Sequence, residues 1–282
     1  MPATIIDGKA LAARYLQEAA EAARSLPRPP TLAAILVGDD PASHTYVRMK
    51  ERRFAEAGFR SQAHLLPANA AEEELTAVVK RANEDELVDG ILIQQPLPSH
   101  LSAARFLSLV DPDKDVDGFH PTNLGRLLAG YETPFVPCTP LGVIRLLESQ
   151  GVQLEGSRAV VVGRSNIVGK PVAILLLQRH ATVTICHTRS KPLADFTRQG
   201  DVLIVAAGRA RLVTGDMIKP GAIVIDVGMN RENGKLLGDV DFESAVQVAS
   251  AITPVPGGVG PMTIAMLLYN TLLSAQRRLG CK

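Results

Sequence analysis

The feature that most constrains the fold is an alternation between short apolar runs rich in β-branched residues and longer segments with helical periodicity. In the first part of the chain, the runs 32–38, 61–66 and 90–95 are predicted strands, and the segments 8–25, 43–58 and 72–83 are predicted helices. Asp7 is suited to cap the first of these helices. Strands that alternate with helices indicate a parallel sheet covered by helices.

A second series of the same kind follows the turn-rich segment 112–123. Its predicted strands are 159–163, 182–187, 202–208 and 222–228, and its predicted helices are 139–150, 170–179 and 192–199. The apolar segment 262–279 is a last predicted helix, which needs a partner surface and is expected to pack back on the first lobe. The sequence therefore predicts two α/β lobes with a cleft between them. The predicted domains are residues 1–137 plus 264–282, and residues 138–263.

Composition excludes several classes of function. The 30 basic and 29 acidic residues are mixed, and the formal charge of +1 favours neither nucleic acid nor an anionic membrane as a partner. The first residues do not resemble a signal peptide, and no apolar run reaches the length of a membrane span. Three scattered cysteines, Cys138, Cys186 and Cys281, fit a reducing cytoplasm. No metal is expected, and the acidic loop that contains Asp111 lacks the spacing of an EF-hand calcium site.

The segment 159-AVVVGRSNIVGKPVAILLL-177 predicts a strand, a glycine turn and a helix. Gly163 and Gly169 occupy the outer positions of the dinucleotide fingerprint G-x-G-x-x-G, and Ser165 replaces its middle glycine. Ser165 offers a hydroxyl and a backbone N–H to a phosphate but permits a less close approach. Taken alone, the turn is equally compatible with a phosphate site and with a purely structural connection.

The end of the following strand indicates which dinucleotide would bind. An NAD site places Asp or Glu there, whereas this strand ends in 187-HTRS-190. Arg189, and Arg164 in the glycine turn, are suited to bind a 2′-phosphate, although most arginines are simply solvated charges. Two arginines at the expected positions favour NADP.

Tyr46 and Lys50 are spaced i, i+4 and therefore share one face of the predicted helix 43–58. An aromatic ring beside an ammonium suits a flat heterocyclic substrate, but the same spacing arises when an aromatic packs on a lysine stem. Short-chain dehydrogenases also use Tyr-x-x-x-Lys; there the pair follows the glycine turn, whereas here it precedes it. Gln94 closes a predicted strand at the carboxyl edge of the sheet, where ligands bind in such folds. It is equally compatible with an amide bonded to its own loop.

The segments YVRMK, GILIQQPLP, PDKDVDGFHP, GRSNIVGKP, IVIDVGMN and TPVPGGVGPMT occur in this order along the chain. In that order they resemble the bifunctional methylenetetrahydrofolate dehydrogenase/methenyltetrahydrofolate cyclohydrolases, over essentially the whole chain. The resemblance implies an α/β fold in two lobes, an N-terminal three-layer catalytic domain and a Rossmann-like NADP-binding domain. It leaves no residues for a separate formyltetrahydrofolate synthetase domain.

The resemblance also implies a reaction and a set of site residues. The family oxidises 5,10-methylenetetrahydrofolate with NADP and hydrolyses the methenyl product to 10-formyltetrahydrofolate, in one-carbon metabolism and purine biosynthesis. The implied catalytic residues are Lys50, Gln94 and Asp117. The implied folate-binding residues are these three with Tyr46, Pro256, Gly257 and Gly258, and the implied NADP-binding residues are Gly163, Arg164, Ser165, Thr188 and Met229.

Three points stay open at this level. This chain has Gln95 where the family usually has leucine, and strand alternation favours Gln94 as the amide that faces Lys50. A monofunctional dehydrogenase and a non-catalytic NADP-sensing protein are alternative functions. A homodimer formed through the cofactor lobe is expected from the resemblance alone.

Overall fold

A computed structural model describes residues 2–281, except for the side chains of residues 41–43, 45 and 46. The chain divides into two compact units. One contains Arg14–Cys138 and Ile264–Lys282, here called the lysine unit because it carries Lys50. The other contains Met1–Ala13 and Thr139–Thr263, here called the nucleotide unit. The predicted α/β fold in two parts is confirmed.

The lysine unit is built on a three-stranded parallel sheet of order β3-β2-β4. Its strands are β2 (Thr31–Val37), β3 (Arg60–Leu66) and β4 (Gly90–Ile93). Its helices are α2 (Pro41–Glu56), α3 (Glu72–Glu84), α4 (Ala103–Leu107) and α5 (Pro121–Ala129). Helices α1 (Gly8–Ala23) and α10 (Val259–Arg278) contribute residues to both units.

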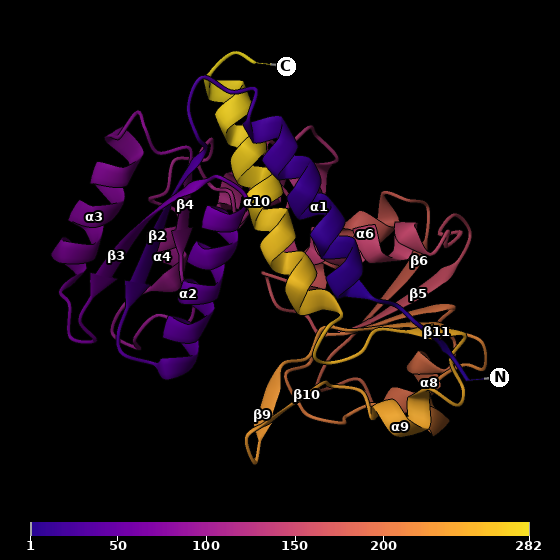
Figure 1. Cartoon of the computed structure of the whole chain (residues 1–282). Coiled ribbons are helices and arrows are strands. Elements are labelled where there is room, and N and C mark those ends of the chain that lie inside the picture. The colour runs from indigo at the N-terminus through magenta and orange to yellow at the C-terminus, as the bar shows by residue number, and fades with distance from the viewer. Residues whose placement is uncertain (1, 282) are drawn as a thin grey trace. The chain divides into compact units, whose positions relative to one another are not determined.

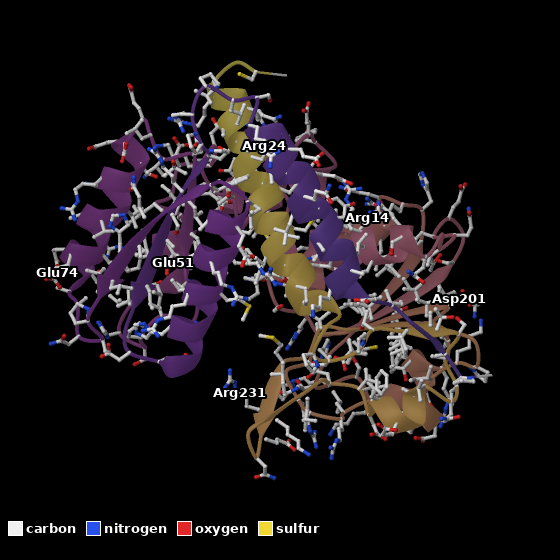
Figure 2. All side chains as sticks on the ribbon, viewed as in Figure 1. Arg14, Arg24, Glu51, Glu74, Asp201 and Arg231 are labelled. Atoms are coloured by element: carbon white, nitrogen blue, oxygen red, sulfur yellow. The ribbon has the colours of Figure 1, made fainter. Side chains whose placement is uncertain are left out.

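Helices cover both faces of this sheet, which accounts for the buried runs of β2 and β4. Alternate residues of β2 pack in one apolar cluster with Leu75 and Val79 of α3 and Phe106 of α4. Helix α2 lies on the other side of the sheet (Figure 1). Figure 2 shows Glu74 on the outer side of α3, where its carboxylate accepts a 2.9 Å hydrogen bond from the Ala71 N–H and so caps the helix.

The nucleotide unit contains a six-stranded sheet of order β1-β11-β8-β7-β5-β6, in which every pair of neighbours is parallel. The strands are β1 (Thr4–Ile5), β5 (Arg158–Val162), β6 (Thr182–Cys186), β7 (Val202–Val205), β8 (Ile223–Asp226) and β11 (Ala251–Ile252). The helices are α6 (Cys138–Ser149), α7 (Gly169–Leu177), α8 (Leu193–Thr197), α9 (Phe242–Ala245) and the 3-10 turn Gly215–Met217. An antiparallel hairpin of β9 (Asn230–Glu232) and β10 (Lys235–Leu237) extends away from this sheet (Figure 1).

The structure differs from the sequence prediction at the N-terminus. Residues 1–13 are predicted to belong to the domain that carries Lys50, whereas β1 pairs with β11 and so joins the nucleotide unit. The pairing involves two residues of each strand, which is too short to produce a periodic signal. The prediction that Asp7 caps α1 is confirmed by a 2.9 Å hydrogen bond from the Ala10 N–H to Asp7 Oδ1.

Helix α10 holds its place in the lysine unit through polar side chains on an otherwise apolar helix. Asn270 Nδ2 donates to the carbonyls of Val116 at 2.8 Å and Val136 at 3.1 Å. Ser274 Oγ donates to the carbonyl of Asp89 at 2.6 Å. These bonds confirm the predicted packing of the last helix on the first lobe. None of the helices that the structure describes is long and apolar enough to cross a membrane.

Candidate active site

Lys50 lies on α2 and is buried in the lysine unit, with only 5% of the residue exposed. Val47 and Phe54, three and four residues away on the helix, are also buried, so Lys50 shares the inward face of α2. The Nζ atom donates a 3.1 Å hydrogen bond to Gln94 Oε1. A lysine is almost never buried without a polar partner, and this one is aimed at the end of a strand.

Gln94 is fixed by bonds at both its backbone and its side chain. Its N–H donates to the Ile35 carbonyl at 2.8 Å, which extends the pairing of β4 with β2 by one residue. Its Nε2 donates to the Gln95 carbonyl at 2.7 Å, so the amide must turn Oε1 toward Lys50. Gln95 Nε2 instead approaches the Ile93 carbonyl at 3.4 Å. Of the two glutamines, Gln94 is the one that faces Lys50, as strand alternation predicts.

Asp117 and Cys138 complete the electrostatic surroundings of Lys50. Burial lowers the pKa of the Lys50 ammonium from its ordinary value, and the Asp117 carboxylate opposes part of that change. Burial raises the pKa of Asp117, and the positive charge of Lys50 opposes that rise. Burial, together with the negative charge of Asp117, raises the pKa of the Cys138 thiol well above its usual range. Cys138 therefore stays a neutral thiol, which is a poor nucleophile.

The loop that carries Asp117 is shaped by its neighbour Asp115. The Asp115 carboxylate accepts hydrogen bonds from the N–H groups of Phe119 at 3.1 Å and His120 at 2.8 Å, and from Asn123 Nδ2 at 2.9 Å. Burial raises the pKa of Asp115 to about 7, and these hydrogen bonds limit the rise. Both Asp115 oxygens thus accept hydrogen bonds from N–H groups.

Among residues 2–281, no group of three His, Cys, Asp or Glu side chains is arranged to hold a metal ion.

The other predicted folate-binding residues are Tyr46, on the same helix as Lys50, and three residues of a loop in the nucleotide unit. Tyr46 lies one helical turn before Lys50 on α2, and its side chain is outside the described part of the chain. Pro256, Gly257 and Gly258 lie in the nucleotide unit, between β11 and α10. Gly257 has a φ of +113°, which favours glycine. A Cβ on Gly8 would lie 1.9 Å from the Gly258 carbonyl oxygen, so this loop is packed tightly against the start of α1.

The glycine turn of the nucleotide unit has the close contacts that its two glycines predict. Gly163 has a φ of +134°, and a Cβ there would lie 2.2 Å from the Ala206 carbonyl oxygen. A Cβ on Gly169 would lie 2.2 Å from the Gly163 carbonyl oxygen. Ser165 Oγ accepts from the N–H groups of Val168 at 3.1 Å and Gly169 at 3.2 Å. The hydroxyl therefore caps the start of α7 and keeps its own proton to donate.

The remaining predicted cofactor residues follow parallel strands at the same edge of the sheet. Arg164 follows β5, Thr188 follows β6 and Met229 follows β8, and all three are exposed. The turn after β6 is held by bonds from the Arg189 N–H to His187 Nδ1 and from the His187 N–H to Ser190 Oγ. A glycine turn before a helix, two exposed arginines and no carboxylate after β6 fit a dinucleotide with a 2′-phosphate.

Sequence reasoning missed Cys138, which lies beside Lys50, and Asn270, which contacts Cys138. Cys138 is fully buried, and its thiol donates to the Val116 carbonyl at 3.3 Å. Asn270 also bonds to Val116 and lies 3.6 Å from the Cys138 sulfur. Neither belongs to a local motif, because 132 residues separate the two along the chain. The available signal was Asn270 itself, an amide in the middle of an apolar run, since a buried amide needs partners.

Comparisons with known proteins assign both units to the same protein family. Residues 6–117 match the model of the catalytic domain of tetrahydrofolate dehydrogenase/cyclohydrolase, and residues 137–279 match its NAD(P)-binding domain. The bifunctional protein FolD of Bordetella avium is 56% identical over 283 residues, which cover 99% of each chain.

Two solved structures are similar over nearly the whole chain. The bifunctional FolD methylenetetrahydrofolate dehydrogenase/cyclohydrolase of Campylobacter jejuni is 50% identical, with a TM-score of 0.96 and coverage of 98% of this chain and 99% of that one. The FolD enzyme of Trypanosoma brucei, solved with NADP cofactor and an inhibitor, is 43% identical, with a TM-score of 0.93 and coverage of 98% of both chains.

Proposed function

Because this chain belongs to the tetrahydrofolate dehydrogenase/cyclohydrolase family, we propose that it catalyses two consecutive reactions of one-carbon metabolism. The first is the NADP-dependent oxidation of 5,10-methylenetetrahydrofolate to 5,10-methenyltetrahydrofolate. The second is the hydrolysis of that product to 10-formyltetrahydrofolate. The observation that carries the hydrolytic step is the buried Lys50 amine held by Gln94.

The oxidation is a positioning task. The carbon that loses hydride is flanked by two substrate nitrogens whose lone pairs stabilise the resulting cation, so no strong protein base is required. When bound, NADP supplies the hydride acceptor. We assign its binding to Gly163, Arg164, Ser165, Thr188 and Met229. Arg164 would meet the 2′-phosphate, and the positive end of the α7 helix dipole would favour the diphosphate.

The hydrolysis requires a group that takes a proton from water. A neutral lysine amine does so, and burial lowers the pKa of Lys50 and thereby favours that form. The bond to Gln94 Oε1 fixes the direction of the amine. The cationic substrate disfavours a charged Lys50 further. We assign Asp117 to the pterin edge, Tyr46 to stacking on the ring, and Pro256, Gly257 and Gly258 to the lining of the folate site.

Three further properties are proposed from the family: a cytoplasmic location, a role in purine biosynthesis, and a homodimer. The dimer is supported by the position of β6 at the edge of its sheet, where Ile185 is 41% exposed. Sedimentation velocity on the full chain tests it, and a monomer at micromolar concentration would contradict it.

The experiment that tests the two activities adds methylenetetrahydrofolate and NADP and follows the absorbance of the methenyl product. Formation followed by accelerated decay is expected for the wild type. Formation without accelerated decay would indicate a monofunctional dehydrogenase, and no formation would indicate an NADP-sensing protein. In Lys50→Met, some hydride transfer should remain while the accelerated decay is lost. Equal loss of both steps would indicate that Lys50 only binds substrate.

A further inference from the structure

Two buried aspartates of the nucleotide unit lie beside the predicted cofactor edge and have no role in the proposed chemistry. Asp226 ends β8 and Asp239 follows β10. They are 4% and 0% exposed. A buried carboxylate is costly unless its oxygens are hydrogen-bonded, so the donors that meet each oxygen show what the group holds in place.

Asp239 holds the loop that follows β7, residues 206–209. Its Oδ2 accepts from the N–H groups of Ala207 at 2.6 Å and Gly208 at 2.8 Å. Its Oδ1 accepts from the Arg209 N–H at 2.9 Å. These three residues are otherwise exposed to solvent. The loop is therefore a surface segment in which the N–H groups of these three residues turn inward to one carboxylate.

Asp226 in turn fixes the position of Asp239. Asp226 Oδ1 accepts from the N–H groups of Asp239 and Gly228, both at 2.9 Å. A Cβ on Gly238 would lie 1.8 Å from Asp226 Oδ2, and one on Gly228 would lie 2.5 Å from Asp239 Oδ1. The approach is so close that neither carboxylate can move without moving the backbone of the hairpin base.

These contacts reach two of the proposed cofactor residues. Ala206 begins the loop that Asp239 holds. Its carbonyl oxygen is so close to Gly163 that a Cβ on Gly163 would lie only 2.2 Å from it. Met229 stands between Gly228 and Asn230, and Asn230 Nδ2 donates to Asp239 Oδ1 at 2.8 Å. Asp239 thus bonds both to the loop after β7 and to Asn230 beside Met229, and that loop packs against the glycine turn.

We propose that Asp239 is a positioning residue for NADP, which fixes the loop 206–209, and through it the glycine turn, in the shape that binds the dinucleotide. The inference rests on the proposed NADP-dependent function. It adds a residue that touches no reacting atom. Preorganisation of this kind strengthens binding because the loop need not be ordered when the ligand arrives.

Asparagine is the informative replacement because it keeps the size of the side chain. An aspartate carboxylate only accepts, whereas an amide has one accepting oxygen and one donating NH2 group. In Asp239→Asn, the NH2 group takes the place of either Oδ1 or Oδ2. It must then face the backbone N–H groups that donate to that oxygen in the wild type. The loop should lose either the bonds of Ala207 and Gly208 or that of Arg209, and become less ordered.

The test measures the dissociation constant of NADP by isothermal titration calorimetry, with folding checked by circular dichroism. Asp239→Asn should raise the constant by about tenfold or more. It should also raise the KM for NADP more than it lowers kcat at saturating NADP. Asn230→Ala, which removes one donor to Asp239, should give a smaller rise. Asp216→Asn is the matched control, because Asp216 is an exposed aspartate of the same unit whose side chain is 75% accessible.

A folded Asp239→Asn protein that binds NADP as tightly as the wild type would overturn the inference. If the variant does not fold, hydrogen exchange on the wild type decides: NADP should slow exchange at Ala207, Gly208 and Arg209, and unchanged exchange there would equally overturn it. A wild type that binds no NADP would overturn the proposed function, and this inference with it. Tight binding by the wild type and by Asp239→Asn alike would overturn the inference alone.

Discussion

The Lys50 ammonium and the Gln94 amide meet at 3.1 Å, and the second hydrogen bond of that amide, to the Gln95 carbonyl at 2.7 Å, leaves its oxygen no other orientation. Gln94→Leu should therefore slow hydrolysis of the methenyl substrate by about 10- to 100-fold, since a hydrogen bond to a chargeable group is lost. The decay of methenyl absorbance, corrected for the uncatalysed rate, measures it. Gln95→Leu is the matched control and should change the rate little. Equal effects of the two variants would contradict the assignment of Gln94.

The pH dependence of hydrolysis should report the ionisation of Lys50. Its pKa is lowered by burial, and the amine acts as a base only when neutral, so the rate should rise with pH through a midpoint below the ordinary lysine value of 10.5. The Asp117 carboxylate raises the pKa of Lys50, so Asp117→Asn should move that midpoint to lower pH. The pH–rate profiles of the two proteins, each corrected for the uncatalysed reaction, provide the comparison. A midpoint that moves upward in the variant would rule out this coupling.

Arg164 should determine the preference for NADP over NAD. Arg164→Ala should raise the KM for NADP by about tenfold or more and that for NAD far less, because only NADP carries the 2′-phosphate. Steady-state rates with each dinucleotide measure the two constants. Lys219→Ala is a suitable control, since Lys219 pairs with Asp201. Asp201, labelled in Figure 2, precedes β7 and so lies at the opposite edge of the same sheet. A proportional rise for both dinucleotides would remove the proposed role.

Asp115 should make stability depend on pH. Its folded-state pKa of about 7 lies above the ordinary value of 3.8, so the native state binds the proton more tightly than the unfolded chain. The resulting stabilisation is present at low pH and is lost as pH rises from the ordinary value through the folded one. Between about pH 4 and about pH 8, the wild type should lose about 4 kcal/mol more of its free energy of unfolding than Asp115→Asn.

Urea unfolding of both proteins at the two pH values measures this difference. Asp113→Asn is the matched control, because Asp113 is an exposed aspartate of the same loop and the variant keeps Asp115. A wild type and an Asp115→Asn variant whose stabilities change in parallel with pH would refute the prediction.

The long, periodic elements were predictable from the sequence, because burial on both faces makes β2, β4 and β7 nearly continuous apolar runs. The β9–β10 hairpin was missed although it carries a hairpin signal, Asn233-Gly234, with positive φ at both residues. Helix α5 was also missed; it begins with Pro121 and a His120 ring that accepts the Thr122 N–H.

The site divides in the same way. Lys50 and Gln94 belong to motifs, and strand alternation correctly selected Gln94 over its neighbour. The roles of Cys138 and Asp239 had no such signal, because each depends on partners far away in sequence. Asn270 offered only an amide within an apolar run. Side chains of this kind are identified by burial and by what they bond, which a single sequence does not display.

The bonds from Asn270 to the Val116 carbonyl and from Ser274 to the Asp89 carbonyl also affect the order in which a newly made chain can fold. The segment that ends at Cys138 leaves the ribosome early, yet the carbonyls of Asp89 and Val116 acquire these partners only when the last helix has been translated. Synthesis therefore finishes the intervening nucleotide unit before the Lys50 surroundings can close. A chain truncated at residue 263 would keep the residues of the nucleotide unit, but the Asp89 and Val116 carbonyls would lack these partners and the loop that carries Asp117 would be less firmly held.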